Sequence, residues 1–152
     1  MLDTPRILQT AAQQTAVIPL KVPKADMRAV MGPGVKELFA AVAAQGVAPT
    51  GPWFTHHLEI VPDRWDFEIG VPVATPVVAA GRVRPGQQPS MKAVRAVYHG
   101  PYEGLGAAWG EFIAWIAANG YATTGELWES YLSGPESKPA DFRTELTKRL
   151  TP

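Results

Sequence analysis

The sequence has no cysteine among its 152 residues, so the chain can form neither a disulfide bond nor a thiolate metal site. It also lacks any apolar run close to the roughly 20 residues that a helix needs to cross a bilayer. The first fourteen residues have no continuous apolar core and no cleavage pattern, so a signal peptide is not expected. We therefore expect a cytoplasmic protein with no membrane partner.

The sequence has no excess charge of either sign. Fourteen Lys and Arg balance fourteen Asp and Glu, and the charges are interspersed without a basic run. Nucleic-acid-binding surfaces are usually basic, so we predict no direct nucleic-acid partner. His56 and His57 are adjacent and would point to opposite faces of a strand, which leaves no ligand set for a metal. No phosphate loop, dinucleotide fingerprint or nucleophile elbow is present, and we predict no cofactor.

Fifteen prolines and fourteen glycines divide the sequence into short segments that are typical of strands and turns. The hydrophobic share of 46% is enough for one core. We expect residues 1–14 to be a loosely held leader, followed by a single domain over residues 15–152. Alternation and helical spacing predict strands at 15–22, 53–61, 65–73, 77–83 and 91–98, a strand bounded by turn residues within 125–135, a last strand at 143–150, and helices at 35–45 and 103–119.

An internal repeat links the two halves. A shift of 74 residues places Gly46 on Gly120, Leu38 on Phe112 and His57 on Tyr131. We therefore predict two repeats, at about 15–74 and 75–152, each a strand–helix–strand–strand unit. Because one unit has too few strands to bury its own apolar face, the two units should pair into one antiparallel sheet. The predicted class is α+β, with two helices on one face and a central cleft.

The stretch from Gly125 to Pro135 contains the candidate site, because alternation places Glu129 and Tyr131 on one face of its strand. That face and the matching face of the first repeat mix aromatic with hydrogen-bonding groups, as small-molecule pockets do. They carry Trp53, Thr55, His57, Glu59, Leu127, Glu129, Tyr131 and Ser133. The more apolar face is expected to lie against the helices. It carries Phe54, Leu58, Ile60, Trp128 and Leu132.

Glu129 can be explained in three ways. It could be a solvated strand residue or the partner of an arginine, which is what most strand glutamates are. It could attract organic cations to an aromatic pocket, or it could act as a general acid or base. Tyr98 and Tyr102 flank a strand-to-helix corner and could cap the helix or form a pocket rim. Trp109 and Phe39 have core spacing and are interpreted as packing residues.

Several linked motifs resemble the GyrI-like small-molecule-binding domain. They are the run His99-Gly100-Pro101-Tyr102-Glu103, a helix with Trp109, the end Asn119-Gly120-Tyr121, and a strand of the form Glu-x-Tyr-Leu-x-x-Pro that begins at Glu129. Residues 66–73 (DFEIGVPV) are similar to the segment that closes the family's first repeat. The resemblance covers about residues 15–150. The same domain forms the effector-binding half of some AraC- and MerR-type regulators.

The resemblance implies a pocket in which Glu129 and Tyr131 meet cationic, aromatic ligands. The predicted ligand-binding residues are Glu129, Tyr131, Trp53, His57, Thr55, Leu127, Tyr98 and Tyr102. Some family members resemble hydrolases that open cyclopropane-bearing genotoxins by water addition, in which case Glu129 and Tyr131 would be catalytic. Other members bind DNA gyrase. Because residues 1–14 leave no room for a helix-turn-helix domain, we do not expect direct transcription-factor activity.

The sequence thus leaves three hypotheses. The preferred one is a stand-alone binding protein for a hydrophobic or cationic small molecule, such as a drug or an effector. The second is a hydrolase that uses Glu129 to activate water and Tyr131 to donate a proton. The third is a role with a protein partner such as gyrase. Binding would be revealed by ligand-induced stabilisation, and hydrolysis by a water-added product.

Overall fold

The computed structural model describes residues 1–134 and 136–152. Pro135, the last residue of the stretch from Gly125, lies outside the described residues, as does the side chain of Ile60. Eight antiparallel strands form one sheet in the order β1-β6-β8-β7-β3-β4-β2-β5. The strands are β1 (Arg6–Gln9), β2 (Gln13–Pro23), β3 (Phe54–Ile60), β4 (Arg64–Pro72), β5 (Arg84–Gln88), β6 (Lys92–His99), β7 (Thr123–Tyr131) and β8 (Arg143–Leu150).

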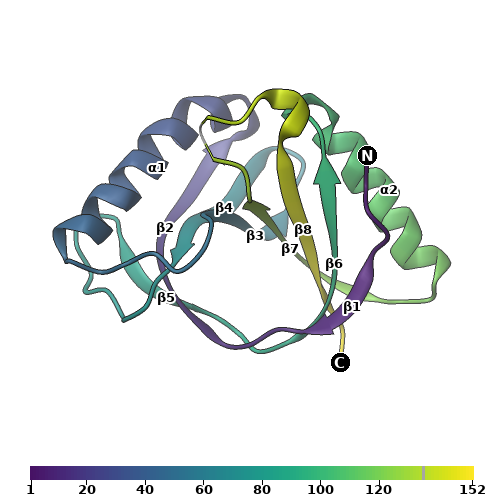
Figure 1. Cartoon of the computed structure of the whole chain (residues 1–152), viewed down its shortest axis with the longest axis horizontal. Helices are drawn as coiled ribbons and strands as arrows, with labels where there is room; N and C mark the ends of the chain where they lie inside the picture. Colours follow the sequence, from purple (N-terminus) through teal and green to yellow (C-terminus); the bar gives the residue numbers. More distant parts are fainter. Residues whose placement is uncertain (135) are drawn as a thin grey trace.

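Two helices, α1 (Met27–Ala44) and α2 (Leu105–Ala118), accompany the sheet, and neither is long and apolar enough to cross a membrane. The chain runs β2-α1-β3-β4 and then β6-α2-β7-β8, and β3 pairs with β7 at the centre of the sheet. Figure 1 shows α1 and α2 on opposite flanks of the central strands. The predicted α+β class is confirmed. The element order is what a duplicated unit would produce, and the duplication itself remains a prediction.

Each helix has its own hydrophobic core. Leu38 and Val42 of α1 are buried against Ile18, Phe67 and Ile69 of the sheet. Under α2, the buried side chains are Ala108, Phe112, Ile116, Val94, Ala96, Tyr98, Leu146 and Leu150. Both cores use the alternate residues of each strand, as expected for a sheet with a helix-covered face. The space between the two cores lies over β3 and β7.

Helix α1 begins eight residues earlier than predicted. The sequence Gly32-Pro33-Gly34 suggested a loop, but Pro33 lies inside the helix. Met27, Val30 and Met31 extend the apolar stripe over the first core, so packing outweighs the cost of the proline. Gly34 permits this approach, because a Cβ at that position would lie 2.7 Å from Ile69 Cδ1.

The strand predicted at 77–83 is wrong. Val77 and Val83 are buried, yet Ala80 and Val83 exchange backbone hydrogen bonds around Gly81 in a tight turn. The strand is instead β5, from Arg84 to Gln88, which adds to the edge beside β2. Pro85 and Gly86 suggested a loop, but an edge strand tolerates proline because its outer N–H groups need no partner.

The N-terminal segment is also better ordered than predicted. Residues 6–9 form strand β1, which pairs with β6, and Asp3 N–H donates to the carbonyl of Val97. The connection from β1 to β2 then crosses from one edge of the sheet to the other, as Figure 1 shows along the bottom of the view. Polar residues such as Gln9 and Gln13 obscure the strand pattern in this part of the sequence. The prediction of a loosely held leader is therefore wrong for residues 6–9 and 13–14.

The predicted orientation of the central strands is reversed. Thr55 pairs with Ile69 on one side and Glu129 on the other, and Glu129 pairs in turn with Leu146. Ile69 and Leu146 belong to the two helix-covered cores, so Thr55 and Glu129 lie on the face that the helices cover. We call it the helix face. Phe54 and Trp128 occupy the opposite, far face, together with Val17, Met91 and Ala93. Alternation groups Thr55 with His57 and Phe54 with Trp128 correctly, but it cannot say which group the helices cover. A register shift between His57 and Glu59 places Glu59 opposite Asp66, and Leu132 lines the cavity with Tyr131, so these two residues were assigned to the wrong groups.

Candidate functional site

The candidate site is built on the two central strands, where neither helix covers the sheet directly. One row of directly paired residues runs across the sheet as Ile18–Ile69–Thr55–Glu129–Leu146–Ala96. Its outer members are buried under α1 or α2. Only the two middle members, Thr55 and Glu129, are polar. The sheet therefore places a carboxylate at the junction between the two cores.

Both oxygens of Glu129 are held by neutral donors. The indole Nε1 of Trp109, on α2, donates to Oε2 at 2.6 Å, and the phenol of Tyr131 donates to Oε1 at 2.7 Å. Within the described chain, no Lys, Arg or His lies within ion-pair distance of this carboxylate. Hydrogen bonds to a carboxylate are charge-assisted and short, so Glu129 is fixed in position without having its charge neutralised.

Tyr131 connects this carboxylate to the space above it. Its hydroxyl lies 3.0 Å from Thr55 Oγ1, and because its one proton goes to Glu129, Thr55 is the donor in that contact. Burial raises the pKa of Tyr131 well above its usual value, and the negative charge of Glu129 raises it further. Tyr131 is therefore a neutral phenol throughout the physiological pH range.

A cavity of about 870 Å³ opens over Tyr131. Its walls are largely aromatic: Trp53 lies 4.2 Å from Tyr131 between ring centroids, and Tyr102 meets Tyr131 edge to face at 6.1 Å. Tyr102 in turn lies 4.8 Å from Phe142. The volume falls within the range of pockets that hold drug-sized molecules. Tyr102 is 47% exposed and stands at the rim of the cavity.

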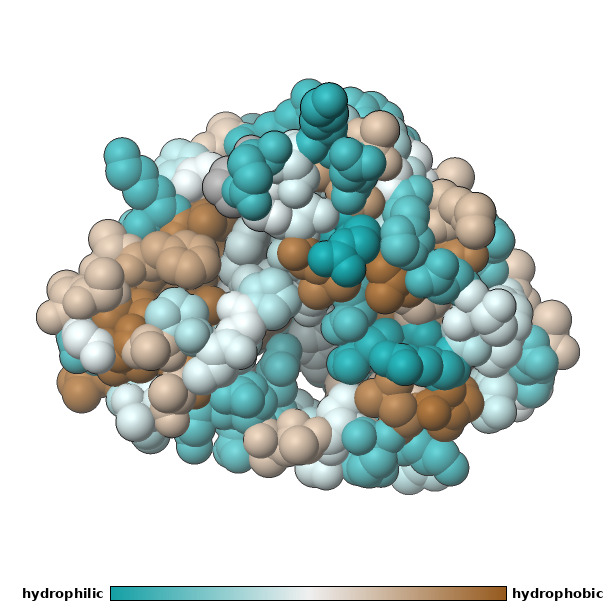
Figure 2. Space-filling model, in the orientation of Figure 1, coloured by the Kyte–Doolittle hydropathy of each residue, from teal (hydrophilic) through white to brown (hydrophobic). Residues whose placement is uncertain are grey.

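Helix α1 supplies the apolar side of the cavity, and β8 supplies a cation at its edge. Val35 and Phe39 line the cavity from α1, and Figure 2 shows apolar residues gathered over this helix. Arg143, at the start of β8, also lines the cavity but is exposed to solvent. The cavity is therefore bordered by both halves of the chain, with neutral aromatic walls, a half-buried carboxylate behind Tyr131 and a solvated guanidinium at the entrance.

The structure brings together some of the predicted ligand-binding residues and separates others. Trp53, Tyr102 and Tyr131 line the cavity, and Glu129 and Thr55 lie beneath it in hydrogen-bond contact with Tyr131. The remaining three do not line it. Leu127 lies one row further along the strand, His57 is buried within the α1 side, and Tyr98 is buried in the core under α2, where its hydroxyl donates to the carbonyl of Pro101.

The environment of His57 disfavours a positive charge on its ring. Its ring stacks on Phe67 and meets the edge of Trp65, and its Nδ1 has no hydrogen-bond partner among the described residues. Burial lowers the pKa of His57 to about 4, with smaller contributions from His56 and Lys24. The side chain is therefore a neutral packing group at pH 7.

Sequence reasoning missed several site residues. Trp109 was interpreted as a packing residue, yet it provides one of the two donors to Glu129. Phe39 was interpreted in the same way, and Phe142 was not considered, but both line the cavity. One signal was available for Trp109, because a partly buried indole N–H usually has an acceptor.

These features match a known family. The family of GyrI-like small molecule binding domains matches residues 3–150, nearly the whole chain. The chain belongs to this family. The search of curated proteins found no match. The family match extends over β1, in agreement with the pairing of that strand in the sheet.

Solved structures show how widely the fold of this GyrI-like domain occurs. The crystal structure of the EcmrR C-terminal domain has a TM-score of 0.83 at 22% identity, over 97% of each chain. In the cryo-EM structure of the EcmrR–DNA complex, the TM-score is 0.82 at 21% identity, over 97% of this chain but only 57% of EcmrR.

Two further solved structures carry other descriptions. A hydrolase encoded by lin2189 from Listeria innocua has a TM-score of 0.69 at 15% identity, over 97% of this chain and 91% of that one. SAV2435, solved bound to tetraphenylphosphonium, has a TM-score of 0.69 at 10% identity, over 98% and 94%. At these identities the likeness concerns the fold. The GyrI-like fold thus occurs in a DNA-bound protein, a hydrolase and a protein bound to an organic cation.

Proposed function

We propose that this GyrI-like domain binds hydrophobic organic cations in the cavity over Tyr131, which α1 borders on one side. The observation that carries the proposal is the state of Glu129, whose carboxylate accepts hydrogen bonds from Trp109 and Tyr131 but has no cationic partner in the described part of the chain. A half-buried carboxylate without a counter-charge attracts a cationic ligand more strongly than an exposed one, because solvent screens it less.

The aromatic walls support the same ligand class. A cation over the face of Trp53, Tyr102 or Phe142 would gain from the ring quadrupole in addition to the charge of Glu129. The apolar surface of Phe39 and Val35 would cover the hydrophobic part of the ligand. SAV2435, which shares the fold, was solved with tetraphenylphosphonium, a ligand of this type.

The test is a calorimetric titration of tetraphenylphosphonium with the wild-type protein and Glu129→Gln. We expect the affinity of the variant to fall about 10-fold, equivalent to about 1.4 kcal/mol. Triphenylphosphine oxide, which is similar in shape but neutral, should bind the two proteins alike. Glu126→Gln is the matched control, because Glu126 lies on the same strand but forms an ion pair on the far face. If wild type and Glu129→Gln bind the cation equally, the charge role of Glu129 is wrong.

A second candidate function is hydrolysis of a strained electrophile. The observation in its favour is the pair of Tyr131 and Glu129, whose oxygens lie 2.7 Å apart next to the cavity. Glu129 would take a proton from water as the water oxygen bonds to a cyclopropane carbon. Tyr131, held as a neutral phenol, would give a proton to the oxygen that receives the electrons of the broken C–C bond.

Mass spectrometry of a cyclopropane-bearing ketone incubated with the protein tests this reaction. Hydrolysis predicts a product heavier by one water, formed faster with wild type than with Glu129→Gln or Tyr131→Phe. A product yield equal to that of the two variants would exclude the reaction and leave binding as the function. Cation binding that persists in Tyr131→Phe would separate the two roles.

A further inference from the structure

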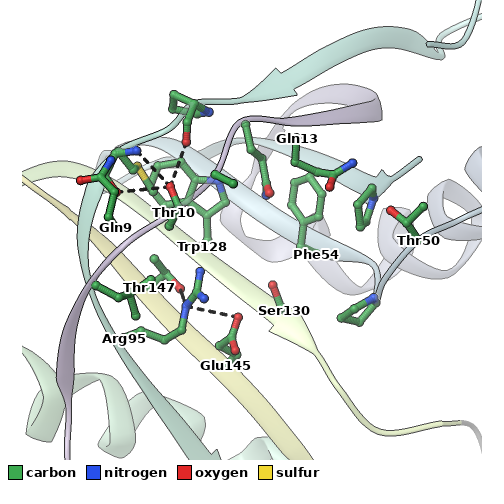
Figure 3. Close-up of a pocket in the computed structure, with 17 residues that line it drawn as sticks. Gln9, Thr10, Gln13, Thr50, Phe54, Arg95, Trp128, Ser130, Glu145 and Thr147 are labelled. Atoms are coloured by element: carbon green, nitrogen blue, oxygen red, sulfur yellow. Dashed lines mark hydrogen bonds and ion pairs between the residues drawn. The ribbon is translucent and has the colours of Figure 1, made fainter. Parts of the chain in front are cut away.

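The far face of the sheet contains a second pocket, separated from the first by the sheet itself. Its volume is about 400 Å³. Phe54 and Trp128 form its floor, and the connection from β1 to β2, which carries Thr10, crosses over it (Figure 3). Figure 2 shows the surface hollowed between this connection and the sheet. Pro52 borders both pockets, and the other residues that line this pocket do not line the cavity over Tyr131.

Two opposite charges stand side by side in the wall of this pocket. Arg95 Nε lies 3.4 Å from Glu145 Oε1 and donates to Thr147 Oγ1 at 3.0 Å. The Nη atoms of Arg95 and Oε2 of Glu145 have no hydrogen-bond partner among the described residues. In Figure 3 the free end of the Arg95 guanidinium points toward Trp128. The pocket therefore presents a donor edge with positive charge next to an acceptor with negative charge.

The rest of the wall is polar, and part of it is held rigidly. The Thr10 hydroxyl donates to the carbonyl of Pro89 and accepts from the Met91 N–H, and Gln13 Nε2 donates to the carbonyl of Val73. Ser130 and Gln88, in contrast, have side chains without a hydrogen-bond partner in the described chain. A fixed wall with unused polar groups is what a preformed site for a polar molecule requires.

We propose that this pocket binds a small zwitterion of the α-amino-acid type. The ligand carboxylate would pair with the Nη atoms of Arg95, and its ammonium group would pair with Glu145. The two charges of an α-amino acid are carried by groups on one carbon, which suits two protein charges that lie 3.4 Å apart. A simple anion placed here would face Glu145 and a simple cation would face Arg95, and such like-charge contacts are unfavourable.

The ligand class also follows from the difference between the two pockets. The cavity on the helix face has a carboxylate without a counter-charge, so it selects for positive charge. The pocket on the far face has no net charge from Arg95 and Glu145, so it selects for a ligand that is itself neutral overall but internally separated in charge. Occupation of one pocket need not displace the ligand of the other.

The experiment is isothermal titration of the full chain with each of the twenty L-amino acids. We expect at least one to bind with a Kd of about 1 mM or below. Its N-acetyl derivative, which lacks the ammonium group, and its carboxamide, which lacks the carboxylate, should each bind at least about 10-fold more weakly, since each leaves one protein charge unmatched. Absence of binding by all twenty at about 10 mM would overturn the proposal.

The double variant Arg95→Gln/Glu145→Gln keeps the shape of the wall and removes both charges. It should lose at least about 10-fold in affinity for the amino acid and retain its affinity for tetraphenylphosphonium. Glu126→Gln/Arg149→Gln is the matched control, because this ion pair lies on the same face but outside the pocket. Equal amino-acid affinity in both double variants, or competition by tetraphenylphosphonium, would show that the pocket is not the site.

Discussion

The two faces of the sheet differ in whether their ionisable side chains have partners of opposite charge. On the far face, His56 lies between two carboxylates, 3.3 Å from Glu68 and 2.8 Å from Glu126, and Arg95 lies beside Glu145. On the helix face, Glu129 is held only by neutral donors and His57 is buried in its neutral form. A carboxylate without a counter-charge favours a cationic ligand, whereas a pair of opposite charges has no net charge to offer and favours a ligand that carries both.

The largest effect is expected from the far face. Trp128 is 4% exposed, stacks on His56 at 4.2 Å between ring centroids, and packs in the small core with Phe54. Trp128→Ala should therefore lower the free energy of unfolding by about 3–5 kcal/mol, as deletion of a buried aromatic ring usually does. Urea denaturation measures this change. A loss below about 1 kcal/mol would mean that the far face is a solvated surface and not a packed one.

The second effect separates the two adjacent histidines. Because the folded protein lowers the pKa of His57 to about 4, the unfolded chain binds a proton at His57 near pH 6.5 and the folded one does not. The resulting loss in the free energy of unfolding is absent above pH 6.5 and grows as the pH falls toward 4. Below pH 4 it reaches roughly 3 kcal/mol.

Urea denaturation across this pH range tests the assignment to His57. His57→Phe should remove this part of the pH dependence. His56→Gln, on the same strand but the far face, should retain most of it, because burial is the largest cause of the lowered pKa of His57. If His56→Gln abolishes the loss of stability at low pH and His57→Phe does not, the histidine with the lowered pKa is His56 and not His57.

The third effect tests how the uncompensated carboxylate is held. Trp109→Phe keeps most of the packing of α2 but removes the donor to Glu129 Oε2. Loss of a hydrogen bond to a charged group should reduce the free energy of unfolding by about 1.5–3 kcal/mol. Trp115→Phe is the control, because Trp115 lies on the same helix and stacks on Tyr121. Thermal or urea denaturation showing equal losses in the two variants would reduce Trp109 to a packing residue.

The smallest effect concerns the entrance of the cavity. Arg143 is exposed, so its repulsion of an organic cation is screened by solvent. Arg143→Gln should strengthen tetraphenylphosphonium binding by about 2-fold at low salt, since exposed charge interactions contribute a few tenths of a kcal/mol. Calorimetry at low and high salt checks this, and the gain should disappear at high salt. Weaker binding by the variant would show that Arg143 contacts the ligand favourably.

The sequence determined most of the content of each strand face and the main elements of the fold, except where a register shift in β3 moves Glu59. Alternation placed Glu129 with Tyr131 on one face and Phe54 with Trp128 on the other, because the two-residue period of a strand is a local property. Helical spacing found α2 to within two residues at its start and one at its end. Both cores followed from the apolar stripes of the helices and strands.

The tertiary structure decided which face the helices cover, and therefore where the cavity lies. Nothing local to β3 or β7 states on which side α1 and α2 cross the sheet, so Phe54 and Trp128 were expected under the helices and lie on the far face instead. The contact of Trp109 with Glu129 joins residues from a helix and a strand, and it exists only once α2 has docked. The sequence thus indicated Glu129, Tyr131 and Trp53, and the packing of the helices added Trp109 and Phe39 and formed the cavity.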